Sequence, residues 1–161
     1  MRGLSPGYYD SAQVDASLRH LFGVDTQLLR DASYYVIEDD GSLVAGGGWS
    51  ARRTLYGGDQ FKAAADPALD PALEPARIRA FFVHPTQARR GLGRALFRRC
   101  AAAAFAAGFR RLELVATLPG APLYRALGFT AVEPVIVRLP DGVEIACSRM
   151  SRPLGEADGI G

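Results

Sequence analysis

Hydrophobic residues recur along this chain with two spacings, and the spacings predict helices alternating with strands. Apolar side chains three and four positions apart predict amphipathic helices over residues 10–22 and 91–107, and a shorter helix over residues 121–127. Runs rich in Val, Ile and aromatic residues predict strands. These runs cover residues 33–38, 42–51, 78–83, 111–116, 129–139 and 143–150. This order of elements is typical of an α/β protein with mixed strand directions.

Turn residues divide the predicted elements. The triplets Asp39-Asp40-Gly41 and Pro140-Asp141-Gly142 predict hairpin turns, because Asp and Gly tolerate the positive φ that tight hairpins require. Residues 52–75 have little periodicity and predict a long loop, a kind of segment that is often functional. We expect residues 1–150 to form a single domain and residues 151–161 to form a disordered tail.

Composition narrows the classes of function. The 161 residues carry a formal net charge of +2, with abundant arginine, one lysine and no asparagine. A GC-rich genome imposes such a bias, so the arginine content is weak support for nucleic-acid binding. Cys100 and Cys147 belong to no metal-ligand or Cys-x-x-Cys motif, so neither a metal nor a disulfide framework is predicted. No apolar run reaches the length of a membrane span, and we expect a cytoplasmic protein without a membrane partner.

Residues 79–96 predict a site for an anion. An apolar strand leads into a His84-Pro85 turn, then into a loop rich in Arg and Gly, and then into a helix. The glycines allow a ligand to approach the backbone closely, and the N–H groups of the first helical turn have no partner within the helix. The helix dipole and the side chains of Arg89, Arg90 and Arg94 add positive charge. The expected ligand is a phosphate or pyrophosphate.

Two known phosphate motifs do not fit this loop. A dinucleotide fingerprint would need a third glycine where Leu96 stands, and no Gly-Lys-Ser/Thr sequence of a P-loop occurs. The strand that ends in Val83-His84-Pro85, followed by Gly91-Leu92-Gly93, resembles the acetyl-CoA signature of the GNAT superfamily of N-acetyltransferases. The signature begins with Arg or Gln, whereas this chain has Ala88 there and Gln87 one residue earlier. A second landmark, residues 124–129, is similar to the family's Tyr-x-x-x-Gly-Phe segment, and the resemblance covers residues 33–150.

The resemblance implies a fold and a reaction. The fold would be α/β, with a mixed, mostly antiparallel sheet whose central strands splay apart and are flanked by helices. The reaction would transfer an acetyl group from acetyl-CoA, as co-substrate, to the amine of a small molecule or peptide, by direct attack on the thioester and without a metal. The residues that would bind acetyl-CoA are Phe81, Phe82, Val83, Arg89, Arg90, Gly91, Leu92, Gly93 and Arg94. Family members normally begin with a strand before the first helix, and the first nine residues do not predict one.

The resemblance also suggests groups for proton transfer. Tyr124 is the candidate acid, because a phenol can hydrogen-bond the departing thiolate. Glu113 is the candidate base, although a solvated strand edge or a structural ion pair explains a charged residue on that strand better. His84 and ordered water are alternative bases. Asp59 and Tyr56, in the long loop, are candidate substrate contacts.

Other functions remain open on the sequence alone. A domain that binds CoA without catalysis would keep the arginine loop but would not need Tyr124. Arg98 and Arg99 either reach the 3′-phosphate of CoA or form a solvated helix face. The acidic character of residues 52–75 favours a cationic amine. A strand edge at residues 33–38 would be exposed if no strand precedes the first helix, which favours a homodimer.

Overall fold

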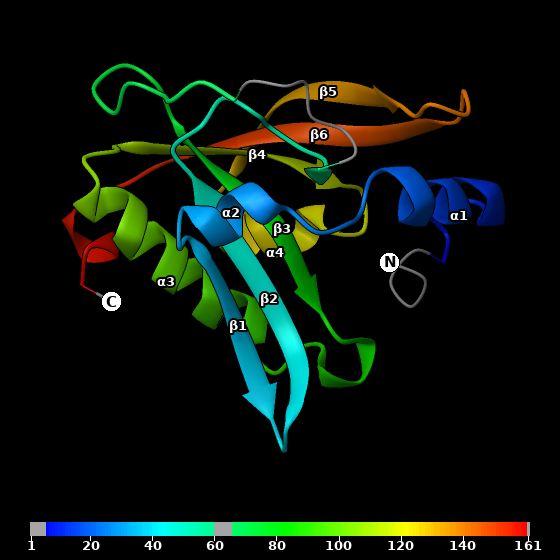
Figure 1. Cartoon of the computed structure of the whole chain (residues 1–161), viewed down its shortest axis with the longest axis horizontal. Helices are drawn as coiled ribbons and strands as arrows, with labels where there is room; N and C mark the ends of the chain where they lie inside the picture. The colour runs from blue at the N-terminus through cyan, green and yellow to red at the C-terminus, as the bar shows by residue number, and fades with distance from the viewer. Residues whose placement is uncertain (1–5, 60–65, 161) are drawn as a thin grey trace.

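The computed structural model describes residues 6–59 and 66–160, and its centre is one six-stranded sheet (Figure 1). The strand order is β1-β2-β3-β4-β6-β5, and only β3 and β4 run parallel. The strands are β1 (Tyr34–Asp39), β2 (Ser42–Ser50), β3 (Ala76–Val83), β4 (Arg111–Thr117), β5 (Thr130–Arg138) and β6 (Glu144–Pro153). The helices are α1 (Ser11–His20), α2 (Thr26–Arg30), α3 (Leu92–Ala106) and α4 (Ala121–Ala126), with 3-10 helices η2 (Pro85–Gln87) and η3 (Glu156–Asp158). The predicted mixed, mostly antiparallel α/β fold is confirmed.

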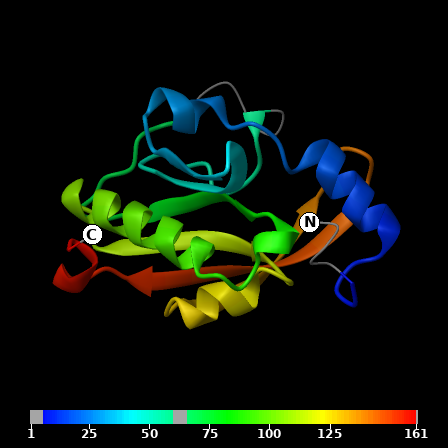
Figure 2. The same cartoon turned by 90° about the horizontal axis from the view of Figure 1, so that it is seen from below.

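Helices cover both faces of the sheet, and the alternation of side chains along the strands separates two hydrophobic clusters. On β4, Leu112, Leu114 and Ala116 pack with α3 and α4, whereas Val115 faces the other way, into a cluster with α1. Figure 2 shows α1 and α2 on one side of the sheet and α4 on the other. We call these two sides the α1/α2 face and the α3/α4 face.

The central strands separate over most of their length. β3 and β4 are paired only at Ala76 with Leu112 and at Arg77 with Glu113, although both strands continue beyond these pairs. β4 stays paired with β6 from Arg111 to Thr117. Beyond Arg77, the edge of β3 that faces β4 therefore has no strand partner within the described residues. The predicted separation of the central strands is thus present: β3 and β4 move apart toward the carboxyl end of β3.

A β-bulge at Ala80 bends β3 where the strands begin to separate. The pairing with β2 shifts register here: Gly48 lies opposite Arg79, and Gly46 lies opposite Phe82. Ala80 has a φ of 53°, an uncommon conformation for a residue other than glycine. Since one extra residue reverses the alternation of the strand, Phe81 points to the α3/α4 face and Phe82 to the α1/α2 face.

Three consecutive glycines of β2 make room for the aromatic side chains of its neighbours. A Cβ atom on Gly47 would lie 2.5 Å from the ring of Phe81. A Cβ atom on Gly46 would lie 2.5 Å from the ring of Phe82 and 2.6 Å from the hydroxyl of Tyr34. The glycines are therefore required by close packing on both faces of the sheet.

Several expected boundaries differ from the structure. The sequence did not predict α2, a five-residue helix too short to show a period. The predicted disordered tail is also different: β6 continues to Pro153, Leu154 is buried, and η3 follows. The tail is ordered by packing, because Arg152 forms an ion pair with Asp158 at 2.8 Å. Residues 60–65 of the predicted loop and the end residues 1–5 and 161 lie outside the described part.

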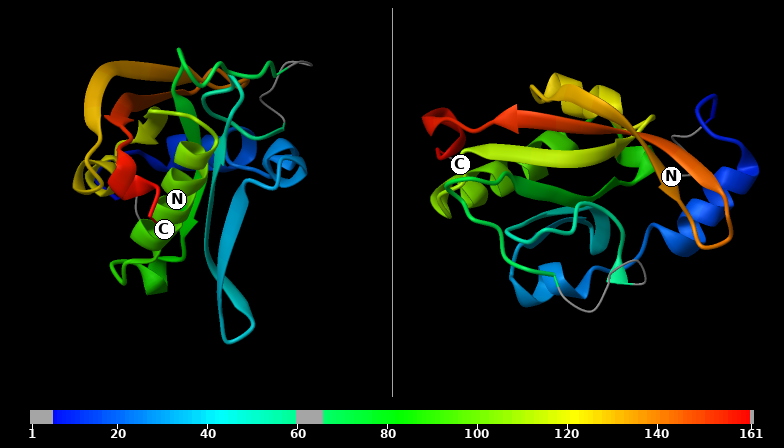
Figure 3. Two further views of the ribbon diagram at one scale, coloured as in Figure 1. Left: turned by 90° about the vertical axis from the view of Figure 1, so that its left-hand side faces the viewer. Right: turned by 90° about the horizontal axis from the view of Figure 1, so that it is seen from above.

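The edge of the sheet formed by β1 is the one on which the prediction of a homodimer depends. Within residues 6–59 and 66–160, β1 pairs only with β2, and the described chain reaches α1 without a preceding strand. The β1–β2 hairpin projects beyond the rest of the molecule (Figure 3). Its turn has the predicted form, with positive φ at Asp40 and Gly41. The homodimer itself stays a prediction.

No helix in the described part of the chain has the length and apolarity to span a membrane.

The bulge generates a test of stability. We expect Ala80→Val to lower the free energy of unfolding by about 1–2 kcal/mol, because a β-branched side chain strongly disfavours positive φ. Ala80→Gly removes the conformational strain and should not destabilise the fold. Ala131→Val is the control: this exposed position on β5 lies beside a register shift but does not have positive φ, so valine there should be neutral. Denaturant unfolding measures all three; equal effects of valine at positions 80 and 131 would contradict the bulge.

Candidate active site

The loop between β3 and α3 presents free backbone amides at the start of a long helix. Arg89 and Gly91 both have positive φ, 65° and 83°. The first hydrogen bond of α3 runs from the N–H of Ala95 to the carbonyl of Gly91 at 3.0 Å. For the amides of residues 89–94 no acceptor is found in the described part of the chain. These N–H groups and the fifteen-residue helix behind them have the geometry expected for an anion site, and anion binding there stays a prediction.

The turn before this loop is fixed by His84. Its Nδ1 lies 2.8 Å from the hydroxyl of Thr86 and accepts the Thr86 amide at 3.4 Å. Its own amide donates to the carbonyl of Val44 on β2 at 2.8 Å. The structure therefore gives His84 a role in the turn, which was one of the two interpretations of this residue.

The two glycines of the loop serve different purposes. A Cβ atom on Gly91 would meet nothing within 4 Å, so this residue is needed for its positive φ and its open approach. Gly93 is buried, and a Cβ atom there would lie 3.1 Å from Leu123 of α4. Gly93 thus lets the start of α3 pack closely against α4, while Gly91 faces solvent.

Aromatic rings close the α3/α4 face beside the separated strands. Tyr124 of α4 lies edge-on between Phe81 and Phe129, with ring centroids 6.3 and 5.8 Å away. Burial raises the pKa of the Tyr124 phenol above its usual value, so the phenol is protonated at neutral pH. Its hydroxyl has no hydrogen-bond partner among the described residues. A neutral phenol beside the open strands can donate a proton but cannot serve as a base.

The arginines of α3 point to two different places. Arg94 and Arg98 line a cavity of about 350 Å³ between α3, α4 and the C-terminal segment, together with Arg152. Arg152 lies over the ring of Phe97 at 5.0 Å. Arg99 lies instead over the ring of Tyr35 on β1, at 5.3 Å. Only Arg98 of the pair considered from the sequence therefore contributes charge to this cavity.

The loop arginines are more exposed. Arg90 hydrogen-bonds Gln87 and lies 3.9 Å from Asp39 at the tip of the β1–β2 hairpin. Arg89 is also exposed, beside the open amides. Leu92 begins α3, and Val83 ends β3 immediately before the turn.

Glu113, the candidate base, is not placed beside Tyr124. It is buried and forms ion pairs with Arg77 and with Arg149, the latter at 3.0 Å. Both pairs lie at the closed end, where β3 and β4 are still hydrogen-bonded, whereas Tyr124 contacts Phe81 beyond the bulge. The structure thus shows Glu113 in the ion pairs of the structural alternative, and its role as a base stays a prediction.

The acidic residues of the long loop are occupied by internal contacts. Asp59 accepts the amide of Thr26 at the start of α2, at 3.0 Å. Asp66 accepts the amide of Thr54 at 2.8 Å. Glu74 accepts the amide of Asp70. These carboxylates organise the loop while keeping their charge, and the expectation of a cationic substrate stays a prediction.

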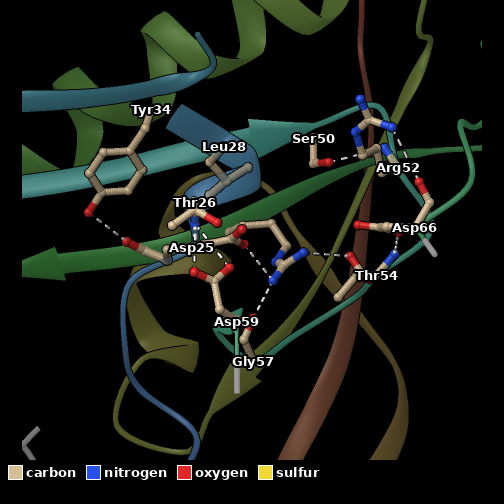
Figure 4. A network of polar contacts seen from close by, with 12 residues as sticks. Asp25, Thr26, Leu28, Tyr34, Ser50, Arg52, Thr54, Gly57, Asp59 and Asp66 are labelled. Atoms are coloured by element: carbon tan, nitrogen blue, oxygen red, sulfur yellow. Dashed lines mark hydrogen bonds and ion pairs between the residues drawn. The ribbon is translucent and has the colours of Figure 1, made fainter. Parts of the chain in front are cut away.

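A buried ion pair holds this loop and α2 to the sheet (Figure 4). Arg79 of β3 lies 2.7 Å from Asp25, and both side chains are only 2% exposed. The same guanidinium donates to the carbonyls of Thr54 and Gly57. Tyr56, the other candidate substrate contact, packs against the cluster beneath α1. The sequence offered no signal for this network, since its members are far apart in the chain.

The sequence analysis also did not predict a structural role for Tyr9. Its hydroxyl donates to the carbonyl of Ala146 on β6 at 2.6 Å and accepts the amide of Leu118, which follows β4, at 2.8 Å. Burial is the largest influence on its hydroxyl and raises the pKa of Tyr9 to about 12. Tyr9 therefore holds the carboxyl end of β4, close to the open part of the sheet.

Comparison with solved structures places the fold among the N-acetyltransferases. A GCN5-related N-acetyltransferase from Rhodopseudomonas palustris aligns with a TM-score of 0.66 at 18% identity, over 94% of this chain and 81% of that one. YncA from Salmonella typhimurium, a putative acetyltransferase solved with acetyl-CoA, gives 0.57 at 19% identity, over 81% and 70%. A phosphinothricin acetyltransferase from Sinorhizobium meliloti, in complex with AcCoA, gives 0.56 at 24% identity, over 81% and 66%.

The family model of the acetyltransferase (GNAT) family matches residues 5–129, and the chain belongs to this family. A comparison with curated proteins gives no match. No group of three or more His, Cys, Asp or Glu side chains suited to a metal occurs within the described ranges.

The role of Glu113 can be tested by stability. We expect Glu113→Gln to lower the free energy of unfolding by about 3 kcal/mol, because it leaves two guanidinium groups without their shared carboxylate. Glu133→Gln is the matched control. Glu133 also pairs with Arg149 but is half exposed, so its loss should cost less than about 1 kcal/mol. Chemical denaturation compares the two variants, and equal losses would contradict a structural role for the buried pair.

Proposed function

We propose that this protein is an acetyl-CoA-dependent N-acetyltransferase in which an amine attacks the thioester directly. The observation that carries the proposal is the unpaired edge of β3 beside a loop of free amides at the start of α3. Acetyl-CoA in two of the related structures supports the same assignment. Family membership supports an acetyltransferase in general.

The loop would bind the pyrophosphate of acetyl-CoA. The amides of residues 89–94 have no acceptor in the described part of the chain, and Arg89 and Arg90 add charge beside them. Gly91 leaves the backbone accessible. Arg94 and Arg98 give the cavity positive charge that suits the 3′-phosphate end of the molecule, whereas Arg152 is paired there with Asp158.

The pantetheine arm would lie along the open edge of β3. Its amides would pair with backbone groups of Phe81, Phe82 and Val83, as an added strand pairs with a sheet edge. A backbone N–H near Val83 would then hydrogen-bond the thioester oxygen as it becomes an oxyanion.

The chemistry needs two proton transfers. The amine nitrogen attacks the carbonyl carbon, the C–S bond breaks, and the thiolate takes the phenolic proton of Tyr124, whose phenolate would then be reprotonated by water that carries the proton lost by the amine. The raised pKa of Tyr124 keeps the phenol protonated, so its O–H is available to hydrogen-bond the thiolate as the C–S bond breaks. Glu113 is held by its ion pairs, so the proton of the attacking amine leaves to ordered water.

Binding of acetyl-CoA is tested by thermal melting. We expect acetyl-CoA and desulfo-CoA to raise the melting temperature, because they bind only the folded state. Gly91→Glu should abolish this shift, since it places a bulky anion where the pyrophosphate binds. No response of the wild-type protein to millimolar CoA would contradict the proposal.

The arginines of α3 provide a matched pair. We expect Arg98→Ala to weaken CoA by about tenfold, because it removes one charged hydrogen bond to the 3′-phosphate. Arg98→Ala should change the affinity for dephospho-CoA little. Arg99→Ala is the control, because Arg99 lies over Tyr35 outside the cavity. Isothermal titration with both ligands measures the difference, and equal effects of the two variants would show that the cavity does not bind the 3′-phosphate.

The role of Tyr124 is tested by kinetics. Tyr124→Phe keeps the ring contacts and should lower kcat by about 10- to 1,000-fold, because only the proton donor is lost. The KM for acetyl-CoA should change by no more than a few-fold. Wild-type turnover by the Phe variant across the pH range would assign Tyr124 to packing. A protein that binds CoA but acetylates no amine would instead be the non-catalytic CoA-binding domain.

A further inference from the structure

We infer that the acceptor of this protein is an amine with a single positive charge and an aromatic or branched apolar group, and that this group packs against Phe82 on the α1/α2 face. The inference rests on the proposed acetyltransferase function, because it takes the thioester to lie along the open edge of β3. It names the chemical class of the second substrate, which the sequence left open.

The first step is the side from which the amine arrives. On the α3/α4 face, the rings of Phe81, Tyr124 and Phe129 pack against one another and against the main core. This packing leaves the α1/α2 face as the side from which an amine can approach the open strands. Phe82 lies on that face directly after the bulge.

The second step is the apolar character of that surface. Val36, Gly46 and Phe82 lie side by side across β1, β2 and β3. Phe82 is 45% exposed and Val36 52% exposed, an unusual exposure for a phenylalanine and a valine on two strands separated only by β2. The ring of Phe82 lies over Gly46, as does the hydroxyl of Tyr34. Tyr34 donates to the carbonyl of Ala80 at 3.3 Å, so its polar end is already engaged and its ring extends the apolar surface.

The third step is the charge around Phe82. All 17 acidic residues fall within the described ranges, and two of those on the α1/α2 face have internal partners. Asp25 is buried against Arg79, and Asp59 accepts the amide of Thr26. Glu38 is exposed on the same side of β1, but two positions beyond Val36, toward the hairpin tip. The surface next to Phe82 therefore offers apolar contact rather than a partner for a second ammonium group.

A comparison of amines tests the inference with the full-length protein. Release of the CoA thiol from acetyl-CoA is measured with phenethylamine, isoamylamine, ethylamine, putrescine and spermidine. We expect kcat/KM for phenethylamine and isoamylamine to exceed that for ethylamine and for both polyamines by at least about tenfold, since burying the apolar group favours the larger monoamines. Preference for putrescine or spermidine would overturn the inference.

Variants locate the effect at Phe82. Phe82→Ala should lower kcat/KM for phenethylamine by about tenfold and for ethylamine much less, because ethylamine has no group to place there. Val132→Ala is the control: Val132 is similarly exposed, 49%, but lies on β5 at the opposite edge of the sheet. Phe82→Leu keeps an apolar side chain and should retain most of the preference for isoamylamine. Equal losses on phenethylamine and ethylamine would overturn the assignment to Phe82.

The two levels of the proposal fail in different ways. Acetyl-CoA that raises the melting temperature, with turnover only on polyamines, contradicts the acceptor class and leaves the proposed function standing. Absence of both a thermal shift and thiol release with every amine contradicts the proposed function, and the acceptor class with it.

Discussion

The separation of β3 from β4 is the constraint on which the rest of the molecule depends. Two residue pairs join these parallel strands, and beyond Arg77 the backbone of β3 has no strand partner on that side within the described residues. An unpaired strand edge inside a domain is costly, because its polar groups need hydrogen bonds. A ligand with its own amides can supply those bonds. The separated strands thus explain both the open edge and the kind of molecule that fits beside it.

The bulge at Ala80 turns this separation into a site with two different faces. Without the extra residue, Phe81 would continue the row of Arg79 on the α1/α2 face, and Phe82 would lie in the core. With it, Phe81 packs against Tyr124, and Phe82 is exposed on the other side. One strained residue therefore places a buried ring beneath the candidate proton donor and an exposed ring where the second substrate would arrive.

Sequence reasoning succeeded where a signal is local and failed where it is not. The loop before α3 was predicted because glycines, arginines and a helix start follow one another within a few residues. The bulge was not predicted, since Ala80 is an ordinary residue and its positive φ results from the pairing of β2 with β3. The Arg79–Asp25 pair and the contacts of Tyr9 were missed for the same reason. Tyr9 bonds Ala146, which lies 137 positions away in the chain.

Glu113 shows that the role of a charged residue on a central strand can be assigned only when the residues that contact it are known. Alternation along β4 indicated only that this side chain points away from Leu112 and Leu114. The structure adds that its carboxylate joins Arg77 of β3 and Arg149 of β6, at the end where the strands are still paired. Buried charges of this kind are costly unless they are paired, and here the pairing links three strands. The ion pairs thus fix the closed end of the sheet, and the aromatic contacts of Tyr124 and Phe81 line the open end. This division places the fixed charges away from the reacting groups, so the environment of Tyr124 stays apolar and its phenol stays protonated.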